Sequence, residues 1–399
     1  MKFFYINIIM NDVYILGYNR TPICSYLGKL KSLSAIQLGE ISVKGLLDKL
    51  NLEPKNIDLV YYGNVLSSGL GQNVARQISY NIGINVPSIT VNRVCSSGME
   101  SIRQGFNSIK IGEADCVLVG GCESMSNSPY INTNIKSGNK MGNFEIKDSM
   151  INDGLIDPFS KKHMGEITED LCEEYNISRN EIDEYAIKSY LKSRNAIENN
   201  VFLDEIQNIN IIEKKNENIV SEDEEINKIE DTKKLYKLKP VFKKDGVITA
   251  GNSSKLSDGA SSMILVSKYF LDKYKLNPLA KIISFDICVS EPRYFPISPI
   301  ASIKNLLEKN NINKNDIDFY EINEAFACVP ILASKEIGID FEKINKYGGA
   351  ISVGHPLGCS GCRIVGTLLN VLKKNNKTTG CASICNGGGG ATSILIEKL

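Results

Sequence analysis

The sequence predicts an α/β fold in which two similar halves enclose an inserted lobe. After residue 11, apolar runs that are typical of buried strands, such as VYILGY and LVYYGNVL, alternate with stretches of helical period, such as AIQLGEISVKGLLDKL. Two distant segments repeat one order of elements, and the composition changes between them. With 399 residues, 42% of them apolar, the chain is long enough for two or three domains with cores of their own.

The two repeated segments begin at Cys95 and Cys359. Each segment predicts a glycine turn, a helix, a strand and a run of glycines, in this order. Each predicted helix has an apolar face, formed by Ile102, Phe106 and Ile109 in the first segment and by Ile364, Leu368 and Leu372 in the second. We infer from this repeat that the chain contains two duplicated α/β halves.

The inserted lobe differs from both halves in composition. Residues 126–256 are rich in Asn, Lys and Glu and contain few strand-like runs, which indicates a more exposed segment. We therefore expect an N-terminal half made of residues 1–125 and 257–278, an inserted lobe at 126–256, and a C-terminal half at 279–399.

The charge balance and the cysteine content exclude several classes of protein. Lysine plus arginine equals aspartate plus glutamate, 46 each, so no global field favours nucleic acid or an acidic membrane, and we expect neither as a partner. Eleven cysteines in a chain of this length are typical of reduced thiols inside a cell rather than of a disulfide scaffold. The start, MKFFYINIIMNDVYIL, has no cleavage signature and no arginine-rich presequence, and no later segment reaches transmembrane length. We therefore expect a soluble protein.

Cys95 has two interpretations. It lies in VNRVCSSGME, just before a predicted helix, where backbone N–H groups favour a thiolate and hence a nucleophile. Free cysteine is also among the most buried residue types and packs as a small hydrophobe. This stretch alone leaves both interpretations open.

The chain has only two histidines, His163 and His355. His355 lies between glycines in GGAISVGHPLGCSGCR, a context that lets a ligand and the backbone approach the imidazole closely. A structural histidine rarely needs so many glycines, so the context favours a functional role for His355. His163 lies in the inserted lobe, in KKHMGE.

Four cysteines raise the alternative of a zinc site or a redox dithiol. The pair Cys359 and Cys362 lies in a helix-starting turn, and the pair Cys381 and Cys385 lies in the strand-like CASIC, whereas structural zinc ligands usually lie on loops. We therefore expect no metal site.

NGGGG at 386–390 offers consecutive amides that suit an oxyanion or a phosphate. The nucleotide-binding patterns GxGxxG and GxxxxGK[ST] are absent from the sequence, which argues against nucleotide hydrolysis.

These motifs together resemble the thiolase family over nearly the whole chain. The resemblance rests on RTPI at 20–23, NRVCSSGM at 92–99, GGCESMS at 120–126, HMG at 163–165, TAGNSS at 249–254, NEAFA at 323–327, GGAISVGHPLGCSG at 348–361 and CNGGGG at 385–390. Within the family, HMG and EPRYFPISP at 291–299 are most similar to the mitochondrial type of acetoacetyl-CoA thiolase. The resemblance implies two thiolase halves in a five-layer αβαβα sandwich, an inserted loop domain that carries CoA, and a homotetramer built as a dimer of dimers.

The resemblance also implies an activity and its residues. The activity is the reversible Claisen condensation of two acetyl-CoA molecules to acetoacetyl-CoA and CoA, with thiolysis as the reverse reaction. Cys95 takes the acetyl group as a thioester, His355 accepts the proton of that thiol, and Cys385 moves a proton of the second acetyl group. His355 and a water held by Asn323 stabilise the enolate, and the N–H groups of Cys95 and Gly387 form a second oxyanion hole.

By the same resemblance, the substrate lies against a defined set of side chains. Coenzyme A is implied to lie along Leu155, His163, Met164, Ala250, Ser254, Ala325 and Phe326. Met164 narrows the acyl pocket against long chains. The pair Phe295 and Pro296 occupies the position that the mitochondrial type associates with tolerance of a 2-methyl branch.

Three positions depart from the family's pattern. Asn227 stands where bacterial relatives place an arginine near the adenine, and Lys228 is its neighbouring cation. Lys255 replaces a small residue beside Ser254. The mitochondrial type binds potassium through a tyrosine hydroxyl and nearby backbone carbonyls, but the tyrosine position is Ile226 here, which leaves potassium activation open. We expect no other cofactor.

Other functions share parts of this pattern. A ketoacyl synthase or a hydroxymethylglutaryl-CoA synthase shares the Cys/His pair but lacks a second cysteine before a four-glycine run, so Cys385 argues against both. A broader-specificity 3-ketoacyl-CoA thiolase, a non-catalytic thiolase-like lipid-binding protein and a Cys/His/Asn hydrolase stay open. The mitochondrial-type resemblance predicts a mitochondrial location, whereas the lack of a recognisable presequence predicts a cytoplasmic one.

Overall fold

One large sheet organises the molecule. The computed structural model describes residues 11–138, 140–213, 216–229 and 231–399, and the expected lack of a presequence concerns residues 1–10, which lie outside the described residues. Ten strands within these ranges form a sheet in the order β12-β13-β14-β11-β1-β10-β5-β3-β4, with β2 paired to β10. The strands are β1 (Val13–Arg20), β2 (Cys24–Ser25), β3 (Leu59–Gly63), β4 (Ser88–Val91), β5 (Cys116–Ser124), β10 (Ser257–Ser267), β11 (Ala280–Val289), β12 (Phe319–Ile322), β13 (Thr379–Asn386) and β14 (Gly390–Lys398).

The sheet consists of two halves with the same pairing. In the N-terminal half, β3 runs parallel to β5, and β10 pairs antiparallel with both β5 and β1. In the C-terminal half, β12 runs parallel to β13, and β14 pairs antiparallel with both β13 and β11. The halves join where 13–15 of β1 pair with 280–282 of β11. This repeated topology confirms the predicted duplication.

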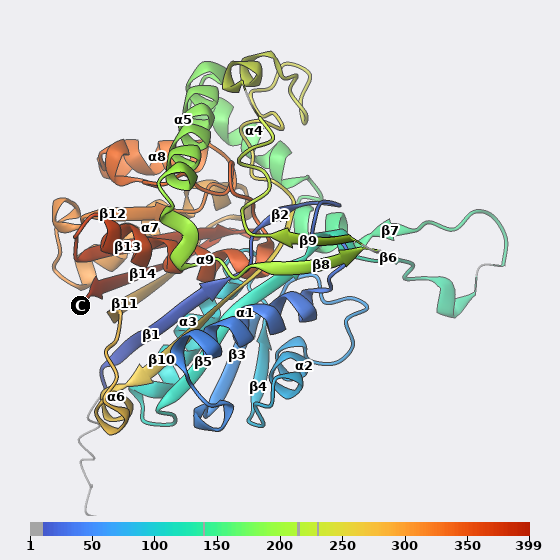
Figure 1. Ribbon diagram of the computed structural model, residues 1–399. Coiled ribbons are helices and arrows are strands. Elements are labelled where there is room, and N and C mark those ends of the chain that lie inside the picture. Colours follow the sequence, from blue (N-terminus) through green and yellow to red (C-terminus); the bar gives the residue numbers. More distant parts are fainter. Residues whose placement is uncertain (1–10, 139, 214–215, 230) are drawn as a thin grey trace, which may run out of the picture.

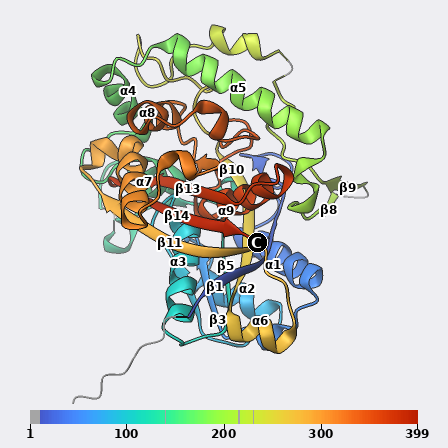
Figure 2. The same cartoon turned by 90° about the vertical axis from the view of Figure 1, so that its left-hand side faces the viewer.

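Helices form a layer between the half-sheets and a layer outside each of them (Figures 1 and 2). In the middle layer, α3 packs on α9, and α9 contacts strands of both halves. Outside, α1 and α2 pack on the N-terminal half and α7 packs on the C-terminal half, with α8 beside it. The bounds are α1 (Ala35–Leu50), α2 (Val74–Asn81), α3 (Ser97–Lys110), α6 (Lys268–Tyr274), α7 (Ser298–Lys309), α8 (Cys328–Ile337) and α9 (Leu357–Lys374). The predicted five-layer αβαβα sandwich is confirmed.

Helix α1 has the residue range that its apolar period predicts. Its start is fixed by a capping box, in which Ser34 Oγ accepts from the Gln37 N–H at 3.3 Å and Gln37 Oε1 accepts from the Ser34 N–H at 2.9 Å. It ends at Leu50, and the next residue, Asn51, adopts the left-handed conformation with φ 48°. Local sequence signals are therefore sufficient to define this outer-layer helix.

Helix α9 differs from the amphipathic helix that the sequence predicts. It is buried along nearly its whole length, including the polar Arg363, Thr367 and Asn370. The reason is its place in the middle layer, where both half-sheets cover it, so the polar side that would face solvent in an outer helix is enclosed as well.

Glycines bring the starts of α3 and α9 together. A Cβ atom at Gly98 would lie 2.8 Å from the Cys362 backbone nitrogen, and one at Gly361 would lie 2.3 Å from the Met99 nitrogen. Side chains would therefore separate the two helix starts. Since Cys95 precedes α3 and His355 precedes α9, this close contact places the two residues near each other.

The inserted lobe is connected to two interior strands of the sheet, at the end where β5 stops and β10 begins. It leaves the chain after β5 and returns before β10, and these strands pair there, Ser124 opposite Asp258. The predicted boundaries at 126 and 256 fall between the two strands. The lobe contains the hairpins β6 (Tyr130–Ile131) with β7 (Lys147–Asp148) and β8 (Ile209–Glu213) with β9 (Asn216–Val220), the π-helix η4 (Met150–Leu155), and the helices α4 (Met164–Glu174) and α5 (Arg179–Glu198). Short 3-10 helices complete the described elements: η1 (Pro54–Asn56), η2 (Met125–Asn127), η3 (Ile135–Ser137), η5 (Val201–Asp204), η6 (Thr232–Lys237), η7 (Pro292–Ile297), η8 (Lys314–Asp316) and η9 (Phe341–Lys343).

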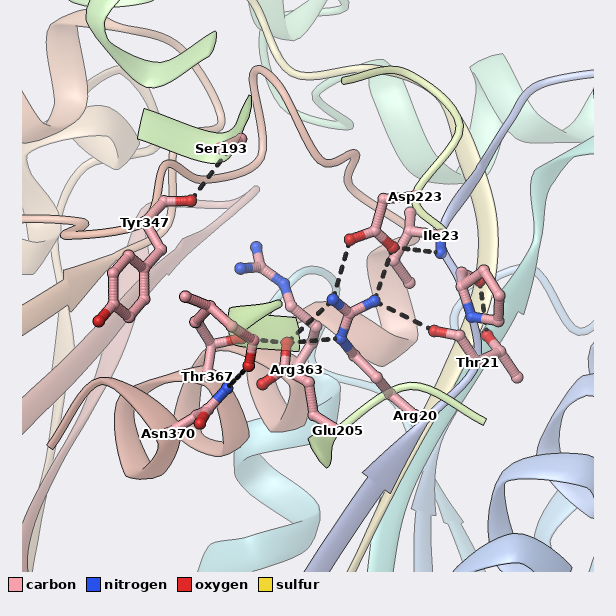
Figure 3. A network of polar contacts seen from close by, with 12 residues as sticks. Arg20, Thr21, Ile23, Ser193, Glu205, Asp223, Tyr347, Arg363, Thr367 and Asn370 are labelled. Atoms are coloured by element: carbon pink, nitrogen blue, oxygen red, sulfur yellow. Dashed lines mark hydrogen bonds and ion pairs between the residues drawn. The ribbon is translucent and has the colours of Figure 1, made fainter. Parts of the chain in front are cut away.

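A buried ion-pair network ties the lobe to β1 (Figure 3). Arg20, in the RTPI motif, donates from Nε to Glu205 at 2.9 Å and from Nη1 and Nη2 to Asp223 at 2.6 and 2.9 Å. Both carboxylates belong to the lobe, and all three side chains are buried. Removing one partner of such a network leaves an uncompensated buried charge, so these contacts fix the lobe strongly.

No described helix combines the length and the hydropathy that a membrane-spanning segment needs.

Candidate active site

A strained turn presents Cys95. The turn follows β4, and Val94 in it has φ 49°, an unfavourable conformation for a β-branched residue. Local hydrogen bonds hold it, because the Val94 N–H donates to Asn92 Oδ1 at 2.9 Å and Ser97 Oγ donates to the Val94 carbonyl at 2.6 Å. Strain of this kind costs about 1–3 kcal/mol and is typical of functional sites.

The thiol of Cys95 is surrounded by two backbone donors. Burial raises its pKa to about 12, while the N–H groups of Gly387 and of Cys95 itself act in the opposite direction. The sequence predicts that the start of α3 favours a thiolate. That expectation is wrong for the resting protein, because the loss of hydration outweighs the two donors, and Cys95 is a thiol at neutral pH.

His355 is held in one tautomer. Ser360 Oγ donates to the Pro356 carbonyl at 2.9 Å, so its oxygen accepts from His355 Nδ1–H, 2.6 Å away. Within the described residues, the buried Nε2 has no hydrogen-bond partner. Burial and the nearby Arg363 guanidinium lower the pKa of His355 to about 3. The imidazole is therefore neutral, with the lone pair of Nε2 available as a base.

The glycines beside His355 serve packing rather than ligand approach. A Cβ at Gly354 would lie 2.5 Å from Ser257 Oγ, and one at Gly358 would lie 2.8 Å from the Cys122 carbonyl oxygen. Gly354 also has φ 122°. The sequence predicts that these glycines let both a ligand and the backbone come close. At Gly354 and Gly358 the atoms that come close are protein atoms, so the expected approach of a ligand there is corrected.

Cys385 and Asn323 lie at the ends of neighbouring strands. Since β12 and β13 are parallel, with Ile322 opposite Ser383, the residues after them share one edge of the sheet. Burial raises the pKa of Cys385 far above its usual value, and Cys95 is close enough to raise it further. Both amide atoms of Asn323 are buried without a partner among the described residues. Such an amide is suited to hold a water or a substrate oxygen.

A cavity of about 400 Å³ opens onto Cys95, His355 and Gly387. The predicted substrate contacts that line it are Leu155, His163, Met164, Ala250, Ser254, Phe295, Ala325 and Phe326. Three predicted residues do not line it. Pro296 is buried next to Phe295, and Asn323 and Cys385 are buried at the strand ends.

The cavity wall also contains residues that sequence reasoning missed. These are Val94, Gly154, Val241, Phe242, Ser253, Leu256 and Leu357, while Lys255 was noted only as a departure. Phe242 stacks on the His163 ring, with centroids 4.7 Å apart. His163 Nδ1 accepts from the Gly165 N–H at 3.0 Å and so caps α4. Phe242 lies in the polar stretch KPVFKK, where no motif marks it.

Two buried carboxylates that sequence reasoning missed hold the site together. Glu123 accepts from the N–H groups of Val65, Leu66 and Gly358. Glu324 accepts from Tyr185 and Ser189 of α5 at 2.9 Å each, from Asn345 at 3.0 Å and from the Ile351 N–H at 3.0 Å. The available signal was a single acidic residue in the small or apolar stretches GGCESMS and NEAFA.

The four cysteines of the zinc hypothesis do not converge. Cys359 packs with Ile23, Cys362 lies in the core between the half-sheets, and Cys381 and Cys385 face the outer layer of the C-terminal half. Within the described ranges, no group of three His, Cys, Asp or Glu side chains is arranged to hold a metal ion.

Near the position that the resemblance associates with the adenine, the cation Lys228 is already paired. Lys228 Nζ lies 3.2 Å from Glu224 and 3.1 Å from Glu225. Asn227 Nδ2 donates to Glu222 at 3.4 Å. Lys228 therefore offers little uncompensated charge to a phosphate.

Comparison with known proteins places this geometry in a family. The chain matches the family models "Thiolase, N-terminal domain" over residues 13–269 and "Thiolase, C-terminal domain" over residues 276–398. It is 41% identical to the cytosolic acetyl-CoA acetyltransferase of Gibberella zeae over 97% of this chain and 98% of that protein. It is 40% identical to the mitochondrial acetyl-CoA acetyltransferase of Homo sapiens over 98% of this chain and 91% of that protein.

Solved structures agree with the sequence comparisons. The Bacillus anthracis acetyl-CoA acetyltransferase superposes with a TM-score of 0.96 at 35% identity, covering 98% of this chain and 100% of that one. A thiolase of Ascaris suum in complex with coenzyme A gives a TM-score of 0.92 at 38% identity, covering 97% and 100%. Human mitochondrial 3-ketoacyl-CoA thiolase gives a TM-score of 0.94 at 36% identity, covering 98% of this chain and 100% of that one.

Proposed function

The chain belongs to the thiolase family, and from this premise we infer that it is an acetyl-CoA C-acetyltransferase. It condenses two acetyl-CoA molecules to acetoacetyl-CoA and CoA, and it catalyses thiolysis in reverse. The observation that carries this inference is one cavity in which the Cys95 thiol, the His355 imidazole and the Gly387 N–H meet, with Cys385 close to Cys95. CoA-dependent loss of acetoacetyl-CoA is the assay that tests it.

In the first half-reaction, Cys95 attacks the thioester carbonyl of acetyl-CoA. Its proton passes to Nε2 of His355, which the Ser360 contact keeps unprotonated beforehand. The N–H groups of Cys95 and Gly387 are aimed at the sulfur and so lie beside the oxygen of the tetrahedral intermediate. The carbon–sulfur bond to CoA then breaks, the leaving thiolate takes a proton from Cys385, and acetyl-Cys95 remains.

In the second half-reaction, the Cys385 thiolate removes a methyl proton from a second acetyl-CoA. Burial raises the pKa of Cys385, so its thiolate is a strong base, as this weakly acidic proton requires. The Nε2–H of His355 and a water on Asn323 stabilise the enolate oxygen. The enolate carbon attacks acetyl-Cys95, the carbon–sulfur bond breaks, and Cys95 regains its proton from His355.

Coenzyme A would enter along residues of the inserted lobe, including its loop at 249–256. His163, Met164, Ala250 and Ser254 all line the cavity that forms this channel. The Ascaris suum relative is described in complex with coenzyme A, which supports the same ligand here.

The alternative functions make different predictions for the same cavity. A non-catalytic lipid-binding protein has no need for Cys95, His355 and Cys385 together, and it would not become acetylated. A hydrolase would release CoA without forming a ketoacyl product. A broader-specificity thiolase would accept long ketoacyl chains, so the substrate range separates it from the function proposed here.

We further propose a homotetramer. The arm formed by β6, β7 and the described residues between them, 132–138 and 140–146, projects from the molecule (Figure 1) and exposes large apolar side chains. These are Tyr130, Ile135, Met141, Phe144 and Ile146. An exposed cluster of this kind is typical of a protein interface.

The relatives include cytosolic and mitochondrial proteins, so they support neither expected compartment over the other.

Ser360→Ala is expected to lower kcat about tenfold, because a hydrogen bond to His355 that fixes its tautomer is lost. KM for acetoacetyl-CoA is expected to change little, since Ser360 does not line the cavity. Steady-state thiolysis measures both constants. Ser360→Thr, which keeps a hydroxyl, is the matched control, and an unchanged kcat in Ser360→Ala would contradict the positioning role.

A methyl group changes pocket binding by about 1–3 kcal/mol, which spans about a 10- to 200-fold rate ratio. The protein is expected to cleave 2-methylacetoacetyl-CoA within about tenfold of the rate for acetoacetyl-CoA, the low end of that range, because Phe295 and Pro296 occupy the position that the resemblance associates with tolerance of the branch. Phe295 lines the cavity. Long-chain ketoacyl-CoA is expected to be rejected, because Met164 Sδ would lie only 3.5 Å from a Cβ placed at Gly387 and thus bounds the acyl pocket. Thiolysis rates on the three substrates measure this range.

Exchange of Phe295 and Pro296 for Met and Gly is expected to lower the thiolysis rate of 2-methylacetoacetyl-CoA more than that of acetoacetyl-CoA. Met164→Ala serves as the control, since it should admit longer chains and leave the branched preference in place. Rejection of the branched substrate by the unmodified protein would rule out the mitochondrial-type specificity and would leave the thiolase activity standing.

A further inference from the structure

The wall of the substrate cavity carries an ammonium group. Lys255 follows Ser254 in the loop that lines the cavity, and its side chain folds back so that Nζ donates to the carbonyl of Ala250 in the same loop. On its other side, Nζ lies 5.9 Å from the centroid of the Tyr190 ring of α5. The cation thus bridges this loop and helix α5, two separate segments of the inserted lobe.

The residues at the position that the resemblance associates with potassium do not fit that ion. Potassium is bound in proteins by oxygen atoms that replace its hydration shell. Ile226 offers no side-chain oxygen, is fully buried, and packs with Ile23 and Val353. The Ala250 carbonyl already accepts from the Lys255 ammonium. The residues present therefore disagree with the potassium site that the family resemblance raised, and no step of the mechanism involves a metal.

The backbone of Lys255 is tied directly to the catalytic base. Its carbonyl accepts from the His355 N–H at 3.0 Å and from Ser257 Oγ at 2.8 Å. The preceding Ser254 N–H donates to the Ala325 carbonyl at 3.0 Å. A contact that fixes the Lys255 side chain therefore also fixes the loop that positions His355.

The charge of this ammonium is supported at neutral pH. Burial lowers the pKa of Lys255 to about 8, and the Glu225 carboxylate acts in the opposite direction. Tyr190 faces the same group through its ring. Because about 8 lies above neutrality, the group stays mainly protonated there.

We propose that Lys255 is a positioning residue whose tethered ammonium takes the place of a free monovalent cation beside the coenzyme A channel. It holds the loop at 249–256, with Ala250 and Ser254, in the conformation that binds the thioester. This role rests on the proposed function. It predicts a protein that is indifferent to potassium and that becomes dependent on a small cation once the ammonium is removed.

The test compares the unmodified protein with Lys255→Ala, which leaves room for a free cation. Thiolysis of acetoacetyl-CoA and the melting temperature are measured in potassium, ammonium and choline chloride at one ionic strength. The unmodified protein is expected to show the same KM and melting temperature in all three salts. In choline chloride, Lys255→Ala is expected to raise KM about tenfold, the size of a lost charge-assisted hydrogen bond, with a smaller change in kcat. Potassium or ammonium is expected to lower the KM of this variant part of the way back to that of the unmodified protein. Either ion is also expected to raise the melting temperature of this variant only.

Lys335→Ala, which removes a surface lysine of α8 that pairs with Glu181 at 2.7 Å, is the matched control and should behave like the unmodified protein. The proposal fails if potassium lowers KM of the unmodified protein several-fold relative to choline. It also fails if no cation restores Lys255→Ala. The measurements on the unmodified protein in the three salts test the proposal even if Lys255→Ala does not fold. Absence of acetylation at Cys95 would instead refute the proposed function, and the melting temperatures would still report on Lys255.

Discussion

Brief exposure to acetyl-CoA is expected to place one acetyl group on Cys95, and Cys95→Ser is expected to lower condensation and thiolysis by about a thousandfold or more. The thiol faces the cavity, and two N–H groups surround its sulfur. A serine hydroxyl is a far weaker nucleophile in this neutral setting. Peptide mapping by mass spectrometry locates the acetyl group. An acetyl group found on Cys385 would reverse the roles assigned to the two thiols.

The pH dependence of this acetylation follows from the same geometry. Burial holds the pKa of Cys95 at about 12 and that of His355 at about 3, so both groups stay neutral between these values. His355 is lost as a base only as the pH falls toward about 3, and Cys95 forms a thiolate spontaneously only as the pH rises toward about 12. The acetylation rate is therefore expected to be flat through the neutral range. A rise that follows a thiol with the ordinary pKa of about 8.5 would contradict transfer of the proton to His355 during attack.

Cys385→Ser is expected to lower condensation by about a hundredfold to ten thousandfold and to leave acetylation of Cys95 largely intact. The methyl proton needs a strong base, which the buried Cys385 thiolate supplies. The leaving CoA thiolate needs little help, since a thiol has an ordinary pKa of about 8.5. The comparison is between the acetyl stoichiometry at Cys95 and the rate of acetoacetyl-CoA formation.

Cys381→Ser provides the matched control for Cys385→Ser. Cys381 is a second buried thiol on the same face of β13, and the proposed mechanism gives it no role. Both half-reactions are expected to survive in this variant. If Cys385→Ser lowers acetylation and condensation equally, Cys385 serves the first step or the structure, and its acid/base role is wrong.

The outer elements and the order of the fold were predictable from local patterns. Helix α1 has the range that its apolar period predicts. Local contacts fix that range, because a capping box at Ser34 starts the helix and the left-handed Asn51 follows its last residue. The duplication was also visible, because each half repeats a glycine turn, a helix and a strand. Helix α9 was predicted as amphipathic and is buried on all sides, because a periodic pattern cannot reveal that two sheets enclose one helix.

The candidate site was predictable in its residue types but not in its electrostatics. Cys95, His355 and Gly387 share one cavity, as expected, and most predicted substrate contacts line it. The thiolate expected at Cys95 was wrong, because burial depends on layers that lie far away in the sequence. Glu123 and Glu324 were missed for a related reason, since their partners come from several separate segments.

The sequence by itself determined which chemical groups this protein has and the order of its elements, because a residue's type and the local period are written in neighbouring positions. Only the tertiary structure decided which groups meet, which are desolvated and which backbone donors surround them. The close contact of Gly98 and Gly361 brings Cys95 and His355 together, and the fold of one loop places the Lys255 ammonium on the Ala250 carbonyl. Distances and hydration depend on contacts between segments that are remote in the chain, and these set the pKa values and the chemistry of the site.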